Sequence, residues 1–169
     1  MTRFMAATAS QSSSGIAIPS ALRYAVYLWG IRLSRQQDIT AHEEVFVQRC
    51  LASVQNAVST LERRPEAVAY VLQAEILLAY YFFDSNRVVE GQVHTSGAVS
   101  IALKYGYHKI VPGQNGAPVS PEVKENIKAW WQVYILEKSW TAALGAPSIL
   151  VEDGGRSNTV DTPWPGSEV

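Results

Sequence analysis

The 169-residue sequence contains one cysteine, Cys50, and few charged residues. A single cysteine excludes an intrachain disulfide framework and a zinc site built from cysteines of this chain. Charged residues make up 17% of the sequence, with 14 basic and 15 acidic side chains and a net charge of −1. This balance provides no basic patch of the kind that binds nucleic acid or an anionic membrane, so we expect neither as a direct partner.

Long hydrophobic runs are also missing. The longest apolar-rich stretch, Ile76 to Phe83, is too short to cross a bilayer. Residues 1–14 lack the apolar segment of a secretory signal and the several arginines of a mitochondrial presequence. Apolar residues nevertheless make up 47% of the chain, with five Trp, eight Tyr and four Phe. This is enough for a hydrophobic core, and the length indicates one domain.

Apolar residues recur at helical spacing along most of the chain, whereas no alternating strand pattern of useful length occurs. The sequence therefore predicts a compact all-α fold of about five helices, which begin near Pro19, Thr40, Pro65, Val88 and Pro121.

Local signals mark several helix ends. Thr40 and Glu43 have the spacing of a capping box, which predicts a helix start. Ser120, followed by a proline and an acid, predicts another. Gly106 and Gly145 are expected to end helices.

The helix predicted from Ala67 to Phe83 is apolar on all sides, which indicates that it lies in the middle of the fold. Glu75 interrupts it, and a buried carboxylate is costly unless a cation or several donors pair with it. Two interpretations stay open: a binding-site carboxylate, or a structural buried pair with an arginine such as Arg87. No second acid lies nearby in the sequence to form a general acid/base couple.

Other candidates are weaker as chemical sites. Glu90 and His94 share a helix face and would form either part of a metal site or a surface pair, but zinc needs three or four ligands. Cys50 lies on the apolar side of a helix and is either core or a nucleophile. Trp130 and its aromatic neighbours would line a pocket or fill the core. Since no glycine-rich phosphate loop or nucleophile elbow occurs, we expect a non-enzymatic domain.

Ordered motifs run from residue 19 to residue 165. They are Pro19-Ser-Ala-Leu22, Tyr27-Leu-Trp-Gly-Ile-Arg-Leu33, Val89-Glu-Gly-Gln-Val-His94, Ala98-Val-Ser-Ile-Ala-Leu103, Gly106-Tyr-His-Lys-Ile110, Trp131-Gln-Val-Tyr-Ile-Leu-Glu-Lys-Ser-Trp140, Ala143-Leu-Gly-Ala-Pro-Ser148 and Asp161-Thr-Pro-Trp-Pro165. In this order and spacing they resemble the middle homology region of fungal-specific zinc-cluster transcription factors, especially the basidiomycete type.

The resemblance implies a regulatory, non-catalytic domain of a nuclear transcription factor for RNA polymerase II genes. Its partners would be other parts of the transcription factor, co-regulators or a small-molecule effector, without direct DNA binding or a membrane. In the family an N-terminal six-cysteine zinc cluster reads DNA, and one cysteine cannot supply it. We therefore expect no cofactor in this chain. A stand-alone helical protein-interaction or effector-binding scaffold is the alternative.

The resemblance also implies a structural role for nine family-motif positions: Trp131, Glu137, Lys138, Gly145, Pro147, Asp161, Pro163, Trp164 and Pro165. Glu137 and Lys138 stand where an Asp-Arg pair is common in the family, a change that preserves charge and is expected to keep an ion pair. Glu75, Arg87 and Trp130 are the candidates for an effector pocket or a buried pair.

These patterns divide the chain into a disordered leader (1–18), a partial middle homology region (19–165) and a tail (166–169). Within the region, residues 112–118 concentrate turn formers and predict a loop. Because the chain begins inside the family's region and ends where that domain usually continues, we expect a truncated piece of a larger helical domain.

Overall fold

The structure is a computed structural model that describes residues 18–112, 119–150 and 159–166. The predicted leader and loop lie almost wholly outside these ranges. Within them the fold is all-α, as predicted, with five helices of 13 residues or more and one short helix. The elements are α2 (Ser20–Arg32), α3 (Gln37–Thr40), α4 (Glu43–Thr60), η1 (Pro65–Ala67), α5 (Val68–Asp84), α6 (Val88–Lys104), η2 (Tyr107–Lys109) and α7 (Pro121–Leu144), where η marks a 3₁₀ turn.

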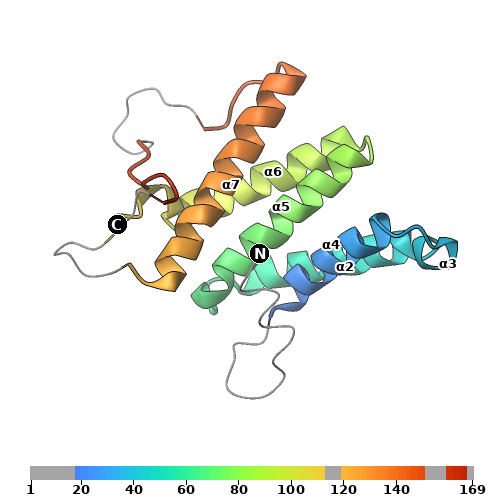
Figure 1. Ribbon diagram of the computed structural model, residues 1–169. Coiled ribbons are helices and arrows are strands. Elements are labelled where there is room, and N and C mark those ends of the chain that lie inside the picture. Colours follow the sequence, from blue (N-terminus) through green and yellow to red (C-terminus); the bar gives the residue numbers. More distant parts are fainter. Residues whose placement is uncertain (1–17, 113–118, 151–158, 167–169) are drawn as a thin grey trace.

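Helix α5 lies between two groups of helices (Figure 1). One side, formed with α2 and α4, buries Ala74, Leu78, Tyr81 and Phe82 of α5. The other side, formed with α6 and α7, buries α5 residues that include Leu72. The expected central position of this helix is therefore confirmed, and its apolar character on all sides follows from being packed on both sides.

The same segment passes a simple test for a membrane span. Pro65–Asp84 is 20 residues long with a mean hydropathy of 1.3, which is long and apolar enough by length and composition. The prediction that the apolar stretch is too short to cross a bilayer is therefore wrong by length and composition. It counted only the unbroken apolar run from Ile76 to Phe83, whereas the whole helical segment also contains a few polar residues. Since 61% of the tested window is buried inside the protein, the hydropathy matches that of a core helix.

Two predicted helix starts have different outcomes. The Ser120 hydroxyl accepts the Val123 backbone N–H at 3.3 Å, so this N-cap is confirmed. The capping box at Thr40 is wrong, because its hydroxyl donates to the Gln37 carbonyl at 3.1 Å and α4 begins three residues later at Glu43. The Glu43 carboxylate does not reach back to the backbone, because it binds side chains of other helices instead.

Glycines end α6 and α7 as predicted. Gly106 and Gly145 both adopt left-handed conformations, with φ of 73° and 63°. At the end of α7 the Ala146 N–H donates to the Thr141 carbonyl at 3.0 Å, which satisfies an acceptor left unpaired by the helix end. Pro147, which is exposed, follows and cannot continue the helix.

Candidate functional site

Glu75 and His94 form a polar pair inside the fold. Glu75 is 6% exposed, and its Oε2 lies 2.6 Å from Nδ1 of His94 on α6. The predicted pairing of Glu75 with Arg87 is therefore wrong, although the prediction of a buried pair holds. Gly97 lies beside the pair, and a β-carbon there would make an ordinary van der Waals contact with Glu75 Oε1 at 3.4 Å. The pair connects α5 to α6.

Arg87 lies at the start of α6 and binds other groups. Its Nη2 and Nε lie 2.6 and 2.8 Å from Glu90 Oε1, and its guanidinium lies 4.6 Å from the centroid of the Phe82 ring. The hydrogen bond from Arg87 lowers the pKa of the Glu90 carboxyl. The predicted surface pairing of Glu90 with His94 is wrong for the same reason, since each of the two residues binds a different partner.

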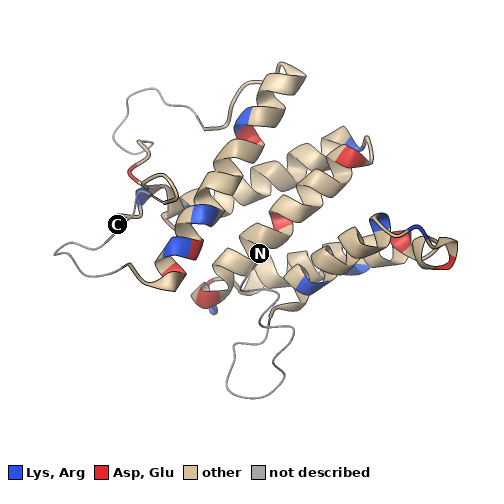
Figure 2. Cartoon of the chain, in the orientation of Figure 1, with Lys and Arg blue, Asp and Glu red and all other residues tan. Residues whose placement is uncertain are grey.

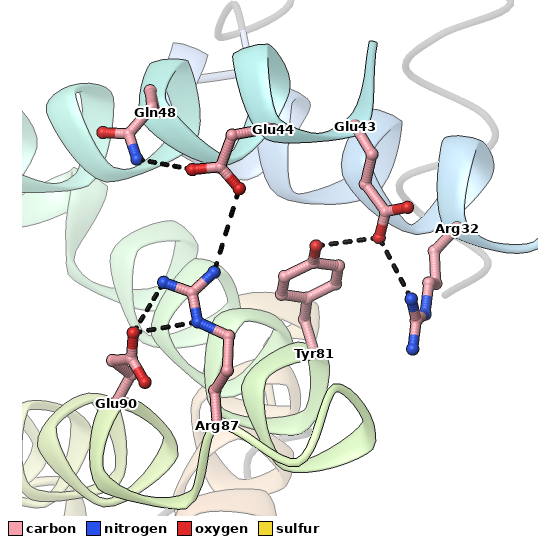
Figure 3. Close-up of polar contacts among 7 residues, drawn as sticks. All are labelled: Arg32, Glu43, Glu44, Gln48, Tyr81, Arg87 and Glu90. Atoms are coloured by element: carbon pink, nitrogen blue, oxygen red, sulfur yellow. Dashed lines mark hydrogen bonds and ion pairs between the residues drawn. The ribbon is translucent and has the colours of Figure 1, made fainter. Parts of the chain in front are cut away.

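A polar network crosses from α4 to the junction of α5 and α6 (Figure 3). Tyr81 Oη donates to Glu43 Oε1 at 2.8 Å, and Arg32 Nη1 lies 3.3 Å from the same oxygen. Burial, together with this hydrogen bond, raises the pKa of Tyr81 to about 12. The neighbouring Glu44 faces Arg87 at 3.9 Å. These contacts join α2, α4, α5 and α6, and the network contains two arginines and three glutamates.

Glu137 and Lys138 bind the chain that follows α7. Glu137 is fully buried, and its Oε1 accepts from Ser148 Oγ at 2.8 Å and from the Ile149 backbone N–H at 2.6 Å. Lys138 Nζ donates to the Leu150 carbonyl at 2.6 Å and to Ser148 Oγ at 2.9 Å. Among the described residues no ion pair joins Glu137 to Lys138, and the expectation that this position keeps an ion pair stays a prediction. The two side chains instead hold residues 148–150 against the helix.

A second segment, the strap of residues 159–165, folds back on η2. Thr162 is buried, and its hydroxyl donates to the Tyr107 carbonyl at 2.6 Å while accepting the Ile110 N–H at 3.0 Å. The Thr162 backbone N–H donates to the His108 carbonyl at 3.2 Å. Thr162 thus satisfies the backbone groups that the short 3₁₀ turn leaves unpaired.

The remaining motif residues fasten the strap to η2 and to α7. Asp161 Oδ2 lies 3.0 Å from Lys109 Nζ. Trp131 Nε1 donates to the Pro163 carbonyl at 2.6 Å, and its ring meets that of Trp164 edge to face at 4.6 Å. Pro165 is half-buried where the strap ends. The family-motif positions therefore hold the C-terminal segments 148–150 and 159–165 against α7 and η2.

Comparison with known proteins identifies the family. The sequence matches the fungal specific transcription factor domain over residues 2–154. The chain belongs to this family. No curated protein and no solved structure gives a significant match. The matched region covers α2 to α7 and ends before the strap. At its other end it includes most of the predicted leader. The predicted domain boundaries at residues 19 and 165 stay a prediction.

At the family level the chain is a regulatory domain of a transcription factor, and the family is generally non-catalytic.

Cys50 does not fit the family's zinc cluster. Its thiol is fully buried, and burial, followed by the charge of Glu75, raises its pKa to about 12. The thiolate that binds metal or attacks a substrate is therefore not formed near neutral pH, which agrees with the prediction of a core cysteine.

Trp130 is part of the core of the domain. Its side chain is fully buried and its ring contacts those of His108 and Tyr134 at 5.8 and 6.2 Å. Glu75 pairs with His94 in a different place, so the three candidates of the sequence do not form one cluster. Thr162 and Tyr81 were missed as site residues. Thr162 could have been found, because it lies within the motif Asp161-Thr-Pro-Trp-Pro165. Tyr81 could not, because its hydrogen bond to Glu43 depends on how α4 packs against α5.

Proposed function

We propose that this chain is the regulatory, non-catalytic part of a nuclear zinc-cluster transcription factor that acts on RNA polymerase II genes. The observation that carries the proposal is the family match over residues 2–154, which includes every described α-helix. The DNA-reading zinc cluster is not built from residues of this chain, because its one cysteine is buried in the core. The domain itself needs no cofactor.

Regulation is proposed to proceed through contacts with other parts of the transcription factor, with co-regulators or with a small effector. Figure 2 shows basic and acidic residues interspersed along the same helices. With a net charge of −1, this surface favours protein partners over the phosphate backbone of DNA.

A reporter assay tests the proposal. The full chain is fused to a heterologous DNA-binding domain and compared with that domain alone. We expect reporter transcription to change with the fusion and to return to the control level when Leu72→Asp, which places an unpaired charge in the core, disrupts folding. The exposed control Val58→Ala should behave as wild type. A fluorescent fusion of the chain should accumulate in the nucleus with its transcription factor.

A DNA-binding measurement can contradict the proposal. The purified chain should bind duplex DNA weakly and without sequence preference at physiological salt. Tight, sequence-specific binding with a steep salt dependence would contradict the absence of a DNA reader.

The stand-alone scaffold remains a second candidate because some aliphatic side chains are largely exposed. Leu33 is 74% exposed, and Val89 and Val93, one turn apart on α6, are 71% and 62% exposed. A partner that covers them would explain this. A monomeric chain that melts cooperatively and binds no hydrophobic dye would count against the scaffold.

A further inference from the structure

Two exposed valines lie on the outward side of α6. Val89 is 71% exposed and Val93, one turn later, is 62% exposed. Ser96 and Ser100 continue the same line at helical spacing, with Ser96 half-buried and Ser100 exposed. These four residues, the outer face of α6, point away from the core.

The outer face of α6 contains no charged residue. Between Val88 and Leu103 the titratable residues are Glu90 and His94, and other side chains of the domain bind both. A surface helix usually places charged residues on the side that faces solvent, as α4 and α7 do with the exposed Arg49 and Lys128. An uncharged face with exposed valines is instead typical of a surface that packs against another protein.

The spacing of this face fits a second copy of itself. In an antiparallel pair whose two-fold axis lies level with residues 94 and 95, Val89 meets the partner subunit's Ser100. Val93 meets the partner subunit's Ser96 in the same way. Each large side chain is then opposite a small one, so the two helices can interdigitate. A parallel pair would set valine against valine and serine against serine.

The polar groups of α6 agree with the antiparallel arrangement. The Ser100 hydroxyl donates to the Ser96 carbonyl at 2.8 Å, so it keeps its hydrogen bond when a partner covers it. Glu90 lies in the first turn and Lys104 in the last, and an antiparallel pair brings the acidic end of each helix toward the basic end of the other. Because both residues already form ion pairs in their own chain, they favour the orientation and add little affinity.

We propose that the outer face of α6 binds a second copy of this chain in an antiparallel, two-fold symmetric helix pair. A single helix face offers less area than the roughly 1,600 Å² buried in a standard protein interface. The dimer is therefore weak and dissociates on dilution. This inference goes beyond the regulatory role and does not depend on it.

Analytical ultracentrifugation of the full chain tests the dimer. The mass should rise from 18.6 kDa toward twice that value as the protein concentration increases. Val93→Glu places two like charges near the two-fold axis and should raise the dissociation constant by about tenfold or more. The control Leu33→Glu changes a similarly exposed aliphatic residue after α2 and should leave the dimer intact.

Two results would overturn the proposal. One is a wild-type chain that stays monomeric at every concentration, and the other is a dimer that survives in Val93→Glu. Circular dichroism checks that both variants keep the wild-type fold, which we expect because both positions are exposed.

Disulfide cross-linking tests the register without relying on a disruptive variant. The native Cys50 is fully buried, so the introduced cysteine is the reactive thiol in Val89→Cys and in Ser100→Cys. A mixture of the two variants should form a covalent dimer under oxidising conditions. Each variant alone should not, because its two cysteines lie about 16 Å apart along the pair, at about 1.5 Å per residue. Cross-linking of either variant alone, or none in the mixture, overturns the antiparallel arrangement.

Discussion

The two sides of α5 are held by different interactions. Toward α2 and α4 the core uses many small side chains, among them Ala21, Ala25, Cys50 and Ala74. Toward α6 and α7 the core of described residues is larger and consists mostly of Leu, Ile, Val and Ala side chains, and Phe83 stacks on Trp140 at 3.7 Å. Because burial stabilises in proportion to apolar area, we expect the α6/α7 side to be the more stable of the two.

The polar contacts differ in the same direction. The α2/α4 side is joined through arginines that are a third exposed, Arg32 at 33% and Arg87 at 35%. The α6/α7 side uses Glu137, which is fully buried. Surface ion pairs are screened by salt, whereas buried hydrogen bonds to a charge are not. We therefore expect α2 and α4 to form the side of the domain that opens more easily.

The largest expected effect comes from a matched pair of leucines on α5. Leu72→Ala on the α6/α7 side and Leu78→Ala on the α2/α4 side each remove a fully buried side chain. Each should lower the free energy of unfolding by about 2–5 kcal/mol in urea titration. Hydrogen exchange should show that Leu78→Ala exposes α2 and α4 first, while α6 and α7 stay protected.

Cys50 reports the same opening. Its thiol is buried on the α2/α4 side, so modification by a thiol reagent requires that side to open. The modification rate should rise more in Leu78→Ala than in Leu72→Ala. Equal rates, with protection lost in all helices together, would break the comparison and show a single cooperative unit.

Local features of the fold could be predicted from the sequence. The Ser120 cap and the glycine ends of α6 and α7 depend on neighbouring residues alone, and these predictions are confirmed. The central position of α5 followed from apolar residues on all its sides. The run of motifs also indicated the family.

Long-range side-chain pairs could not be predicted. Thr40 and Glu43 have the right spacing for a capping box, but Tyr81, 38 residues away, takes the Glu43 carboxylate. Glu75 pairs with His94 because of how α6 rotates against α5, which spacing does not specify. Glu137 binds Ser148 and Ile149, and this contact depends on how the chain after α7 folds back on the helix. Tertiary packing decides among partners that local spacing leaves equal.

Glu137 tests whether the buried polar contact stabilises the α6/α7 side. Glu137→Ala removes the acceptor of Ser148 and Ile149 and should lower the free energy of unfolding by about 2–4 kcal/mol. Glu137→Gln keeps an acceptor oxygen and should cost about half as much. Urea titration measures both, and equal losses would show that hydrogen bonding is not the cause.

Two glycines of α6 provide a smaller effect. A β-carbon at Gly91 would lie 2.6 Å from the Phe83 ring, which is stacked against Trp140 and has little room to move. Gly91→Ala should therefore cost about 1–3 kcal/mol by thermal or urea unfolding. Gly97→Ala, where the nearest atom is 3.4 Å away, is the control and should be neutral or stabilising by up to about 1 kcal/mol. The opposite order would mean that α6 does not approach α5 closely at Gly91.

The smallest effect should come from Arg87 on the α2/α4 side. Arg87→Met removes its contacts with Glu44 and Glu90 but keeps an apolar stem over Phe82, and should cost less than about 1 kcal/mol at low salt. The control Arg64→Met, in a more exposed pair, should cost less still.

Salt and pH separate this effect from packing. The pKa of Glu90 is lowered in the folded domain, so its contribution is present at neutral pH and is lost as the pH falls through that lowered pKa. The difference between wild type and Arg87→Met should therefore shrink in acid and in high salt. The Glu137→Ala difference should persist in high salt. If salt reduced both equally, the two sides of α5 would not differ in how their polar contacts are screened.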